Sequence, residues 1–443
     1  MSEKAVVAPV YFDPGRDDEF DEQLARLRQM LGDLVEFAEP VALGNHVGEV
    51  DAVIFPQILG EAYRQAEAFQ AIDVPILIIT SEFGTLQMWD WEIKSYLSSK
   101  GVTTIAPYSL EDSRKVCQAL NARREMRSTK FLIFQDNPGE GFQASIFKRF
   151  FWWEQEATDL LGERFGLTVV RKSFKELGAR AGSIPDADAE GELLSKDFPH
   201  SGLSTQSLLS AVKLYMAVRE ELDADPSIRG VGINCLNESH FSDTTPCLAW
   251  DLHFTERRIL WACEGDTITL ATKYIIHKSL GVPLLMSNIY PFVMGNAALK
   301  HERIPSFPEI IEEPDNHLLL AHCGYLGVCP RCFARKGRWV LKPKVLAIVD
   351  ENAHAIDADM NPGPCTLAKL DPSMTKLMVI EAENRGYVQY ADSDLLNGAV
   401  IRVPDGHRLM RNVYSHHQLL VEGHIERDLL LVGDVFGIEI VSA

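Results

Sequence analysis

Hydrophobic runs alternate with helically spaced hydrophobic positions through the first part of the chain. The helical spacing is clearest over residues 20–34. Four short hydrophobic runs, typical of buried strands, cover residues 5–10, 52–55, 75–79 and 102–106. Because strands that alternate with helices predict a parallel sheet covered on both faces, we expect residues 1–128 to form an α/β domain with a structural or oligomeric role.

The same alternation continues over residues 129–335 and predicts a second α/β domain. Buried strands are expected at residues 130–134, 167–170, 230–235 and 259–263, and helices at 204–222 and 267–280. The polar stretch 184–201 is expected to be a long loop. Between the first two of these strands, a helix is expected to carry Phe147, Phe150, Phe151, Trp152 and Trp153. Such aromatic surface is typical of a core or a subunit interface rather than of a sugar-stacking site.

The pattern changes over residues 336–443, where hydrophobic stretches are short and separated by turn residues. Strands are expected at 345–349, 376–380, 387–390, 399–403, 417–421 and 429–432. Several short strands with frequent turns favour a small β-barrel or sandwich. The fold class is therefore α/β, with two Rossmann-like α/β domains that contain parallel sheets, followed by a C-terminal β-barrel-like domain.

Length and charge agree with a multidomain globular protein. A chain of 443 residues is too long for one ordinary core. Its net charge of −20, without a basic stripe, argues against a nucleic-acid partner. Neither a signal peptide nor a membrane-spanning run is recognisable, so we expect a cytoplasmic protein with no membrane partner and with reduced cysteines.

Two acids stand where a predicted buried strand meets a predicted helix. Glu264, Gly265 and Asp266 follow the strand at 259–263 and precede the helix at 267–280. Open α/β sheets bind ligands at such strand ends, and buried charge is costly unless it is hydrogen-bonded, paired or bound to a metal. The acids fit two interpretations, a cap of the following helix or a functional site.

Histidines at the ends of two later hydrophobic strands favour the functional interpretation. His322 ends one strand, while His416 and His417 open another. Neighbours in a strand point to opposite faces, so only one of His416 and His417 can reach a given site. A carboxylate and two imidazoles are suitable ligands for a divalent ion such as Mn²⁺.

Other polar groups carry weaker signals. Glu238 and His240 lie just past a strand end, which suits either ligand contact or a solvated loop. Cys329 and Cys332, with Cys323 upstream, resemble half of a zinc site. Because no second Cys-x-x-Cys pair is present, packed thiols are the favoured interpretation.

These motifs resemble those of the L-arabinose isomerase and L-fucose isomerase superfamily. The resemblance rests on Glu264-Gly265-Asp266, on His322 followed by Val328-Cys329-Pro330, on His417 with His424, and on Gly363-Pro364-Cys365-Thr366. It implies that Glu264, His322 and His417 bind Mn²⁺ or another divalent metal. It also implies two α/β domains followed by a β-rich domain, in a homo-oligomer with sites between subunits.

The chain departs from the family at one catalytic position. The resemblance implies a second catalytic carboxylate at the end of the strand that follows the helix at 267–280, yet Ser287 and Asn288 stand there. Neither side chain ionises. Asp266, Glu238 or Asp243 are the candidates to supply the missing acid.

The expected function is that of a metal-dependent aldose–ketose isomerase, an intramolecular oxidoreductase, acting on a sugar or sugar derivative through an enediolate. The catalytic residues implied are Glu264 and Asp266. The substrate-binding candidates are Glu238, His240, Ser287, Asn288, His416 and Lys369, and Arg331 is a further candidate for an anionic substituent. Two alternatives stay open, namely another metal-assisted carbanion reaction such as epimerisation or dehydration, and a non-catalytic sugar-binding relative.

Overall fold

The computed structural model describes most of the chain. The described residues are 4–12, 15–57, 62–81, 88–136, 149–235, 237–291, 312–322, 327–344, 352–389 and 397–443. They form two compact units, each assembled from separate segments of the chain. The first unit contains Met1–Arg127, Ile275–Gly281 and Arg427–Glu439, and the second contains Ser128–Tyr274, Val282–Glu426 and Ile440–Ala443.

The first unit is built on a parallel sheet. Its strand order is β2-β1-β4-β5-β6, with β3 also paired to β1. The strands are β1 (Val6–Tyr11), β2 (Glu36–Phe37), β3 (Val41–Ala42), β4 (Ala52–Phe55), β5 (Ile76–Ile78) and β6 (Thr104–Ile105). The helices are α1 (Asp18–Leu31), α2 (Ala66–Gln70), α3 (Met88–Ser99), α4 (Leu110–Met126) and α13 (Glu426–Phe436). The expected α/β character of this part is confirmed.

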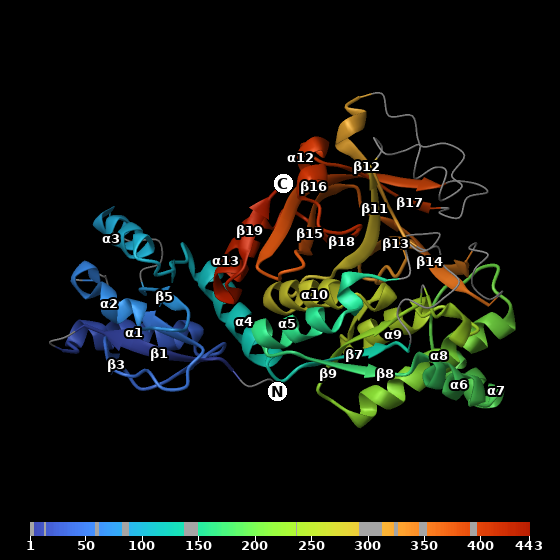
Figure 1. Cartoon of the computed structure of the whole chain (residues 1–443), viewed down its shortest axis with the longest axis horizontal. Helices are drawn as coiled ribbons and strands as arrows, with labels where there is room; N and C mark the ends of the chain where they lie inside the picture. Colours follow the sequence, from blue (N-terminus) through green and yellow to red (C-terminus); the bar gives the residue numbers. More distant parts are fainter. Residues whose placement is uncertain are drawn as a thin grey trace. The chain divides into compact units, whose positions relative to one another are not determined.

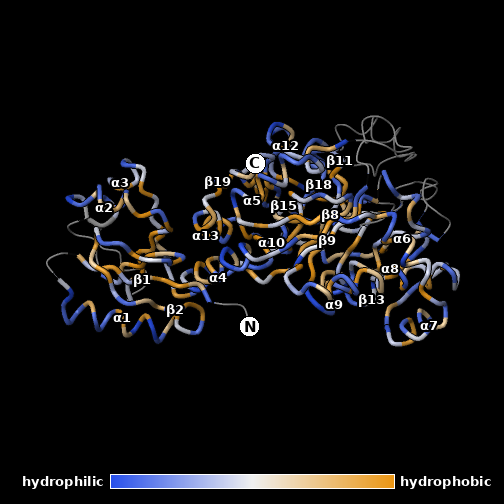
Figure 2. The backbone as a smooth tube through the Cα atoms, turned by 60° about the horizontal axis from the view of Figure 1, so that its bottom comes forward, coloured by the Kyte–Doolittle hydropathy of each residue, from blue (hydrophilic) through white to orange (hydrophobic). Residues whose placement is uncertain are grey.

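A second parallel sheet carries the segment around Glu264. Its order is β10-β9-β7-β8. The strands are β7 (Lys130–Phe134), β8 (Thr168–Lys172), β9 (Ile228–Ile233) and β10 (Leu260–Ala262), and the helices are α5 (Gln155–Phe165), α6 (Phe174–Ser183), α7 (Asp186–Leu194), α8 (Thr205–Ala224), α9 (Cys247–Arg257) and α10 (Thr267–Leu280). Figure 2 shows hydrophobic stretches gathered around β9 and α10, and around β1 in the first unit.

Two glycines in β9 let neighbouring elements approach the sheet closely. A Cβ atom on Gly230 would lie 2.8 Å from Phe131 and 2.9 Å from Leu270 of α10, and one on Gly232 would lie 3.2 Å from the Cα atom of Gly265. Side chains at these positions would push α10 and the Glu264 segment off the sheet. The glycines therefore set where that segment sits.

The remaining strands close an antiparallel barrel. Six strands follow one another in the order β15-β18-β11-β12-β17-β16, and β16 pairs back to β15, while β19 adds to β16. The six barrel strands are β11 (Leu285–Pro291), β12 (His317–Ala321), β15 (Gly363–Leu370), β16 (Lys376–Gln389), β17 (Asn397–Arg402) and β18 (His417–Glu422). The added strand is β19 (Glu439–Ser442), and the short helix is α12 (Gly406–Asn412). Strands β13 (Ala334–Pro343) and β14 (His354–Met360) form a separate hairpin. The expected barrel is confirmed.

The barrel takes strands from earlier in the chain than expected. Its strands β11 and β12 precede residue 336, and Figure 1 shows the olive β11 among the orange and red strands. Both strands are apolar runs, a pattern that fits a strand of the parallel sheet as well as a strand of the barrel. The sequence pattern does not identify which strands pair with them. The expected domain boundary at 335/336 therefore separates β11 and β12 from the barrel strands with which they pair.

Two expected elements are wrong. The predicted loop at 184–201 contains α7, which starts directly after Pro185 with Asp186 and Asp188 in its first turn, an arrangement that favours a helix start. The predicted strand at 429–432 is part of α13, whose buried residues follow helical rather than alternating spacing. The expected strand at 345–349 lies outside the described residues.

The aromatic segment after β7 is only partly described. Residues 137–148 lie outside the described ranges, and Phe151–Trp153 form a single 3₁₀ turn rather than a long helix. Trp152 and Trp153 are buried, as the core interpretation predicts.

Candidate metal centre

A tight turn at the end of β10 presents Glu264. The strand is fully buried, and the turn Cys263–Gly265 that follows it places Glu264 at a φ of 56° and Gly265 at 62°. The left-handed region costs a non-glycine residue about 1–2 kcal/mol, and such strain is often stored at functional sites. The indole N–H of Trp153 donates to the Glu264 carbonyl over 2.6 Å and helps to hold the turn.

Asp266 both caps α10 and faces the barrel. Its carboxylate accepts a hydrogen bond of 2.8 Å from the backbone N–H of Thr269 and one of 2.7 Å from the Thr269 hydroxyl. This is the N-cap role that the sequence left open. The same carboxylate also receives Lys369 and His417 from barrel strands, so the capping and functional interpretations hold together.

Glu264, His322 and His417 converge at one end of the barrel. The Oε1 atom of Glu264 lies 4.0 Å from Nε2 of His322, and its Oε2 atom lies 3.6 Å from Nε2 of His417. The two imidazole rings stack with centroids 5.7 Å apart. Strand β11 lies between their strands, since Asn288 pairs with His417 on one side and with Ala321 on the other. The expected meeting of these three residues is confirmed.

A chain of charged groups stands behind His417. Nδ1 of His417 lies 2.8 Å from Oδ2 of Asp266, and the same oxygen accepts a 2.8 Å bond from the Lys369 ammonium. Lys369 also contacts the Thr269 hydroxyl. Because Lys369 is 2% exposed and binds Asp266, its ammonium is occupied within the protein rather than presented to a substrate.

The local charges shift the titration of these groups in opposite directions. Burial raises the pKa of Glu264, but the positive charge of His417, with that of His322, lowers it to about 2. Burial likewise raises the pKa of Asp266, which Lys369 and His417 bring below its ordinary value. Burial lowers the pKa of His417, whereas the Glu264 and Asp266 carboxylates raise it to about 9. Negative charge concentrated at this point attracts a cation, whether a proton or a metal ion.

The donor atoms of the group fit a divalent metal. The ligand atoms of Glu264, His322 and His417 all lie within 4.8 Å of one another. Oε2 of Glu264 and Nε2 of His417 are buried and make no hydrogen bond, although buried polar atoms are normally paired. The carboxylate of Asp266 on the far nitrogen of His417 is the support that metal-binding histidines usually have. This group can therefore hold a divalent cation, and it is the one such group among the described residues.

Aromatic rings line one side of the group. The Trp152 ring lies 5.2 Å from that of His417, and Phe150 stacks on Trp152 at 4.3 Å. His416 contacts both Phe150 and Trp152 at ring distances of 5.8 and 6.0 Å, and its pKa is lowered to about 3 by burial and by the charge of His417. His416 therefore belongs to this aromatic wall and is neutral at ordinary pH.

Several predicted candidates serve elsewhere. The Glu238 carboxylate accepts the backbone N–H of Asp136 just past β7, at 3.0 Å to each oxygen. The His240 ring packs against that of Phe241 at an interplanar angle of 48°, and Asp243 accepts a hydrogen bond from the Ser210 hydroxyl. The Arg331 side chain contacts the Asp197 carbonyl. None of these four joins the metal-ligating group found among the described residues.

The position of the missing second acid lies on β11. Ser287 is fully buried and its hydroxyl makes no hydrogen bond, while Asn288 donates to the Tyr290 hydroxyl over 3.2 Å and leaves its Oδ1 unpaired. Within the described part of the chain, Glu264 and Asp266 are the carboxylates in contact with His417. No third acid stands in for the absent carboxylate there.

The cysteine motif shows no zinc geometry in the described residues. Cys329 is buried, Cys332 is exposed, and neither joins a metal-ligating group. Burial raises the pKa of the Cys329 thiol well above its ordinary value, which keeps it protonated. Cys323 lies outside the described residues. The favoured interpretation of packed thiols fits Cys329.

The sequence missed the partners that hold the turn and the cap. Trp153 was expected in a core or a subunit interface, and Thr269 was not singled out, yet both bind the Glu264-Gly265-Asp266 segment directly. Thr269 stands three residues after a candidate N-cap acid, where the backbone N–H is the usual partner of an N-cap side chain, and this position was the available signal. Nothing in the sequence linked Trp153 to Glu264.

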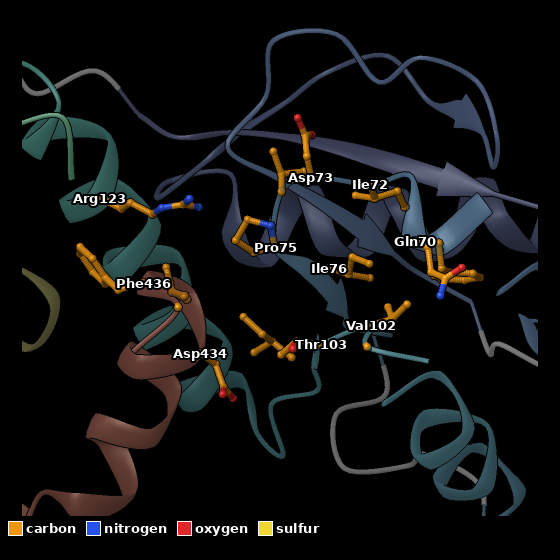
Figure 3. Close-up of a pocket in the computed structure, with 16 residues that line it drawn as sticks. Gln70, Ile72, Asp73, Pro75, Ile76, Val102, Thr103, Arg123, Asp434 and Phe436 are labelled. Carbon is orange, nitrogen blue, oxygen red and sulfur yellow. The ribbon is translucent and has the colours of Figure 1, made fainter. Parts of the chain in front are cut away.

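A separate pocket lies within the first unit. It has a volume of about 300 Å³ and is lined by apolar residues such as Ile76, Val102 and Phe436, with Arg123 and Asp434 among its charged groups (Figure 3). Burial raises the pKa of Asp434, against the opposing charge of Lys94. Metal-ligating side chains do not converge at this pocket among the described residues, so we place the candidate chemistry at Glu264.

Comparisons with known proteins leave the family open. No family model matches the chain, and no curated protein matches it in sequence. The likeness to sugar isomerases therefore stays a prediction. In the part of the chain that the structure describes, no helix has the length and apolarity to cross a bilayer.

Proposed function

We propose that this chain is a metal-dependent aldose–ketose isomerase-like enzyme that acts on a sugar or sugar derivative through an enediolate. The observation that carries the proposal is the buried convergence of Glu264, His322 and His417, with Asp266 bound behind His417. These three side chains would hold the ion, for which we propose Mn²⁺, because mixed carboxylate and imidazole donors suit it.

A bound divalent ion would supply Lewis-acid polarisation of the substrate carbonyl and its neighbouring hydroxyl. Glu264 is ionised at neutral pH, since its pKa is lowered to about 2 after the opposing effect of burial. Its carboxylate is the candidate base that removes the proton from the hydroxyl-bearing carbon and returns it to the former carbonyl carbon. Asp266 fixes the orientation of His417, and the Trp152 and Phe150 rings shield the group from water.

A second reaction class is favoured by the polar but uncharged groups on β11. Ser287 and Asn288 cannot ionise, and Asp266 is occupied by Lys369, Thr269 and His417. A single free carboxylate can remove the proton from one carbon, which is the first step of an epimerase or a dehydratase acting on a sugar. A non-catalytic sugar-binding relative is the remaining alternative, and it requires no metal-dependent turnover.

Replacement of Glu264 by Gln tests the proposal. Purified protein loaded with Mn²⁺ is incubated with a panel of aldoses and ketoses in D₂O, and NMR follows deuterium at each substrate carbon. We expect E264Q to lose turnover by about 10²–10⁴-fold, the usual contribution of a positioned base. Asp243→Asn, an acid that binds Ser210 instead, serves as the control and should retain activity.

The position of the label separates the candidates. Deuterium with interconversion of aldose and ketose supports the isomerase, and inversion at a single carbon supports the epimerase. Full activity in E264Q would refute the assignment of the base. Sugar binding by a metal-free wild type without turnover would point to the non-catalytic relative.

A further inference from the structure

Two residues with amide side chains follow neighbouring strands at the carboxyl edge of the second parallel sheet, the edge that also carries Glu264. Gln135 follows β7 and Asn234 follows β9, and the register pairs Phe134 with Ile233. The backbone N–H of Asn234 donates to the Phe134 carbonyl, so the hydrogen bonding between β9 and β7 continues as far as Asn234. A Cβ atom on Gly265 would lie 3.9 Å from the backbone nitrogen of Asn234, which places the Asn234 backbone directly beside the turn that carries Glu264.

These amides are buried but unpaired. Asn234 is 0% exposed, and neither its Oδ1 nor its Nδ2 makes a hydrogen bond to a described residue. Gln135 is 7% exposed, and its Nε2 likewise has no hydrogen-bond partner among the described residues. An unsatisfied buried polar group costs about 1–3 kcal/mol. Several such atoms on two neighbouring side chains indicate that an external partner completes them.

The indole N–H of Trp152 adds a third unpaired donor. Trp152 is 7% exposed, its Nε1 makes no hydrogen bond within the described part of the chain, and its ring lies against His417. Trp152 thus borders the candidate metal group through His417, and Asn234 follows β9 beside the turn that carries Glu264. A single ligand bound at the metal group is therefore a candidate partner for these atoms.

The chemistry of the unpaired atoms selects the ligand. A side-chain amide offers both a donor and an acceptor, as a hydroxyl does, so amides bind hydroxyl groups without a change of charge. The buried cations of this region are already occupied, since Lys369 binds Asp266 and Lys273 donates to the Trp261 carbonyl. Phosphate or carboxylate groups would need a free cation. The complementary ligand is a neutral chain of hydroxyl-bearing carbons.

We propose that Gln135, Asn234 and the indole N–H of Trp152 form a hydroxyl-binding subsite beside the candidate metal group, which orients the polyol chain of the substrate. This assignment rests on the proposed function in placing the reacting carbons at Glu264. It adds three residues that determine which hydroxyl configuration is accepted.

The test uses apolar replacements of similar shape in the full chain. The variants are Asn234→Leu and Gln135→Met, and the control is Asn384→Leu, a buried amide that donates to the Asn361 carbonyl and accepts from the Gly386 N–H. The probes are five- and six-carbon alditols, which cannot isomerise, with inorganic phosphate as the anionic comparison. Calorimetry measures probe and Mn²⁺ affinity, and urea denaturation measures stability without probe.

We expect at least one alditol to bind the wild type, and N234L and Q135M to bind it about tenfold more weakly, as the loss of a neutral hydrogen bond predicts. Mn²⁺ affinity should change less than twofold in either variant. Without probe, N234L should be as stable as the wild type or more stable, because it removes unpaired polar atoms, whereas N384L should be destabilised. Phosphate should bind none of them.

Three outcomes would overturn the assignment: no alditol binds the wild type, both variants bind the alditol as the wild type does, or phosphate binds the wild type in preference. Destabilisation of N234L comparable to that of N384L would also overturn it, because it would reveal a structural role. If the wild type binds the alditol but not Mn²⁺, and N234L loses the alditol, the subsite stands and the isomerase proposal fails.

Discussion

At the scale of single residues, Asp266 links helix α10 to the candidate metal group. One carboxylate caps α10 through Thr269 and holds His417 through Nδ1. The sequence could predict Glu264, His322 and His417, because each stands at the end of a hydrophobic strand and matches a family motif. It could not predict the bonds of Asp266 to His417 and Lys369, since those partners lie on barrel strands whose register is set by the whole fold.

Replacement of Asp266 by Asn should weaken metal binding. The amide removes the negative charge that supports the basicity of His417, and loss of such a support costs about 10–100-fold in metal affinity. Mn²⁺ affinity is measured by calorimetry at pH 7.5. Asp251→Asn is the control, because Asp251 is equally buried and does not belong to the metal-ligating group. Equal losses in D266N and D251N would contradict the role assigned to Asp266.

The same measurement has a defined pH dependence. The carboxylates raise the pKa of His417 to about 9 although burial lowers it, so a metal must displace a proton from this imidazole at neutral pH. In the wild type, affinity should rise with pH by up to about tenfold per unit below pH 9. D266N should show a shallower rise, because it removes one of the charges that hold the proton.

At the scale of elements, the sequence pattern located buried strands correctly in several places, but it did not distinguish strand from helix in short apolar segments. The predicted strands at 52–55 and 130–134 coincide with β4 and β7, because four consecutive buried apolar residues fit a strand with both faces covered. The segment at 429–432 has a similar run, yet it forms part of α13. A short apolar run cannot distinguish strand from helix, and only the buried positions further along α13 resolve it.

The turn between β10 and α10 should be sensitive to a single methyl group. Gly265→Ala places a Cβ atom in the left-handed region and 3.2 Å from Cγ2 of Ile133. Gly281→Ala is a matched control, because its φ is +70° and a Cβ atom there meets nothing within 4 Å. We expect G281A to cost about 1–2 kcal/mol of backbone strain with unchanged metal affinity.

G265A should lose more stability than G281A and should also weaken Mn²⁺ binding, since Ile133 pushes the neighbouring Glu264 out of position. Urea denaturation and calorimetry provide the two readings. If G265A and G281A change stability and Mn²⁺ affinity equally, the effect at Gly265 is no more than ordinary backbone strain.

At the scale of the whole molecule, hydrophobic patterning predicted which kinds of sheet are present but not which strands belong to each sheet. Two parallel sheets and a barrel were expected and are present. Strands β11 and β12 join the barrel through pairing with β18 and β17, which come from much later in the chain. Such long-range pairing leaves no local signature, so a boundary drawn from composition alone falls in the wrong place for these strands.

The stability of the molecule should fall in mild acid because of buried neutral histidines. Burial lowers the pKa of His354 and of His253 to about 3, from an ordinary value of 6.5. Nε2 of His354 accepts the backbone N–H of Leu248 at the start of α9, over 3.1 Å, which requires the unprotonated nitrogen. Unfolding below pH 6.5 therefore takes up protons, so stability is complete above pH 6.5 and falls as pH drops toward 3.

Each of these histidines should contribute a loss of up to about 1.4 kcal/mol per pH unit in that range. Urea denaturation at pH 7.5 and 5.5 measures the loss. We expect H354Q to be less stable than the wild type at pH 7.5, but to lose about 1.4 kcal/mol less on acidification. His407→Gln, at an exposed histidine, should leave the loss unchanged. An identical loss in H354Q and the wild type would show that His354 does not titrate on unfolding.

The discontinuous make-up of the two units constrains the order in which the chain can fold as it is synthesised. The first unit contains Ile275–Gly281 and Arg427–Glu439 in addition to Met1–Arg127, and the second contains Ile440–Ala443. A ribosome-bound chain that ends before these segments has neither unit complete. The nascent N-terminal sheet therefore lacks its last helix until residues 427–439 have been translated.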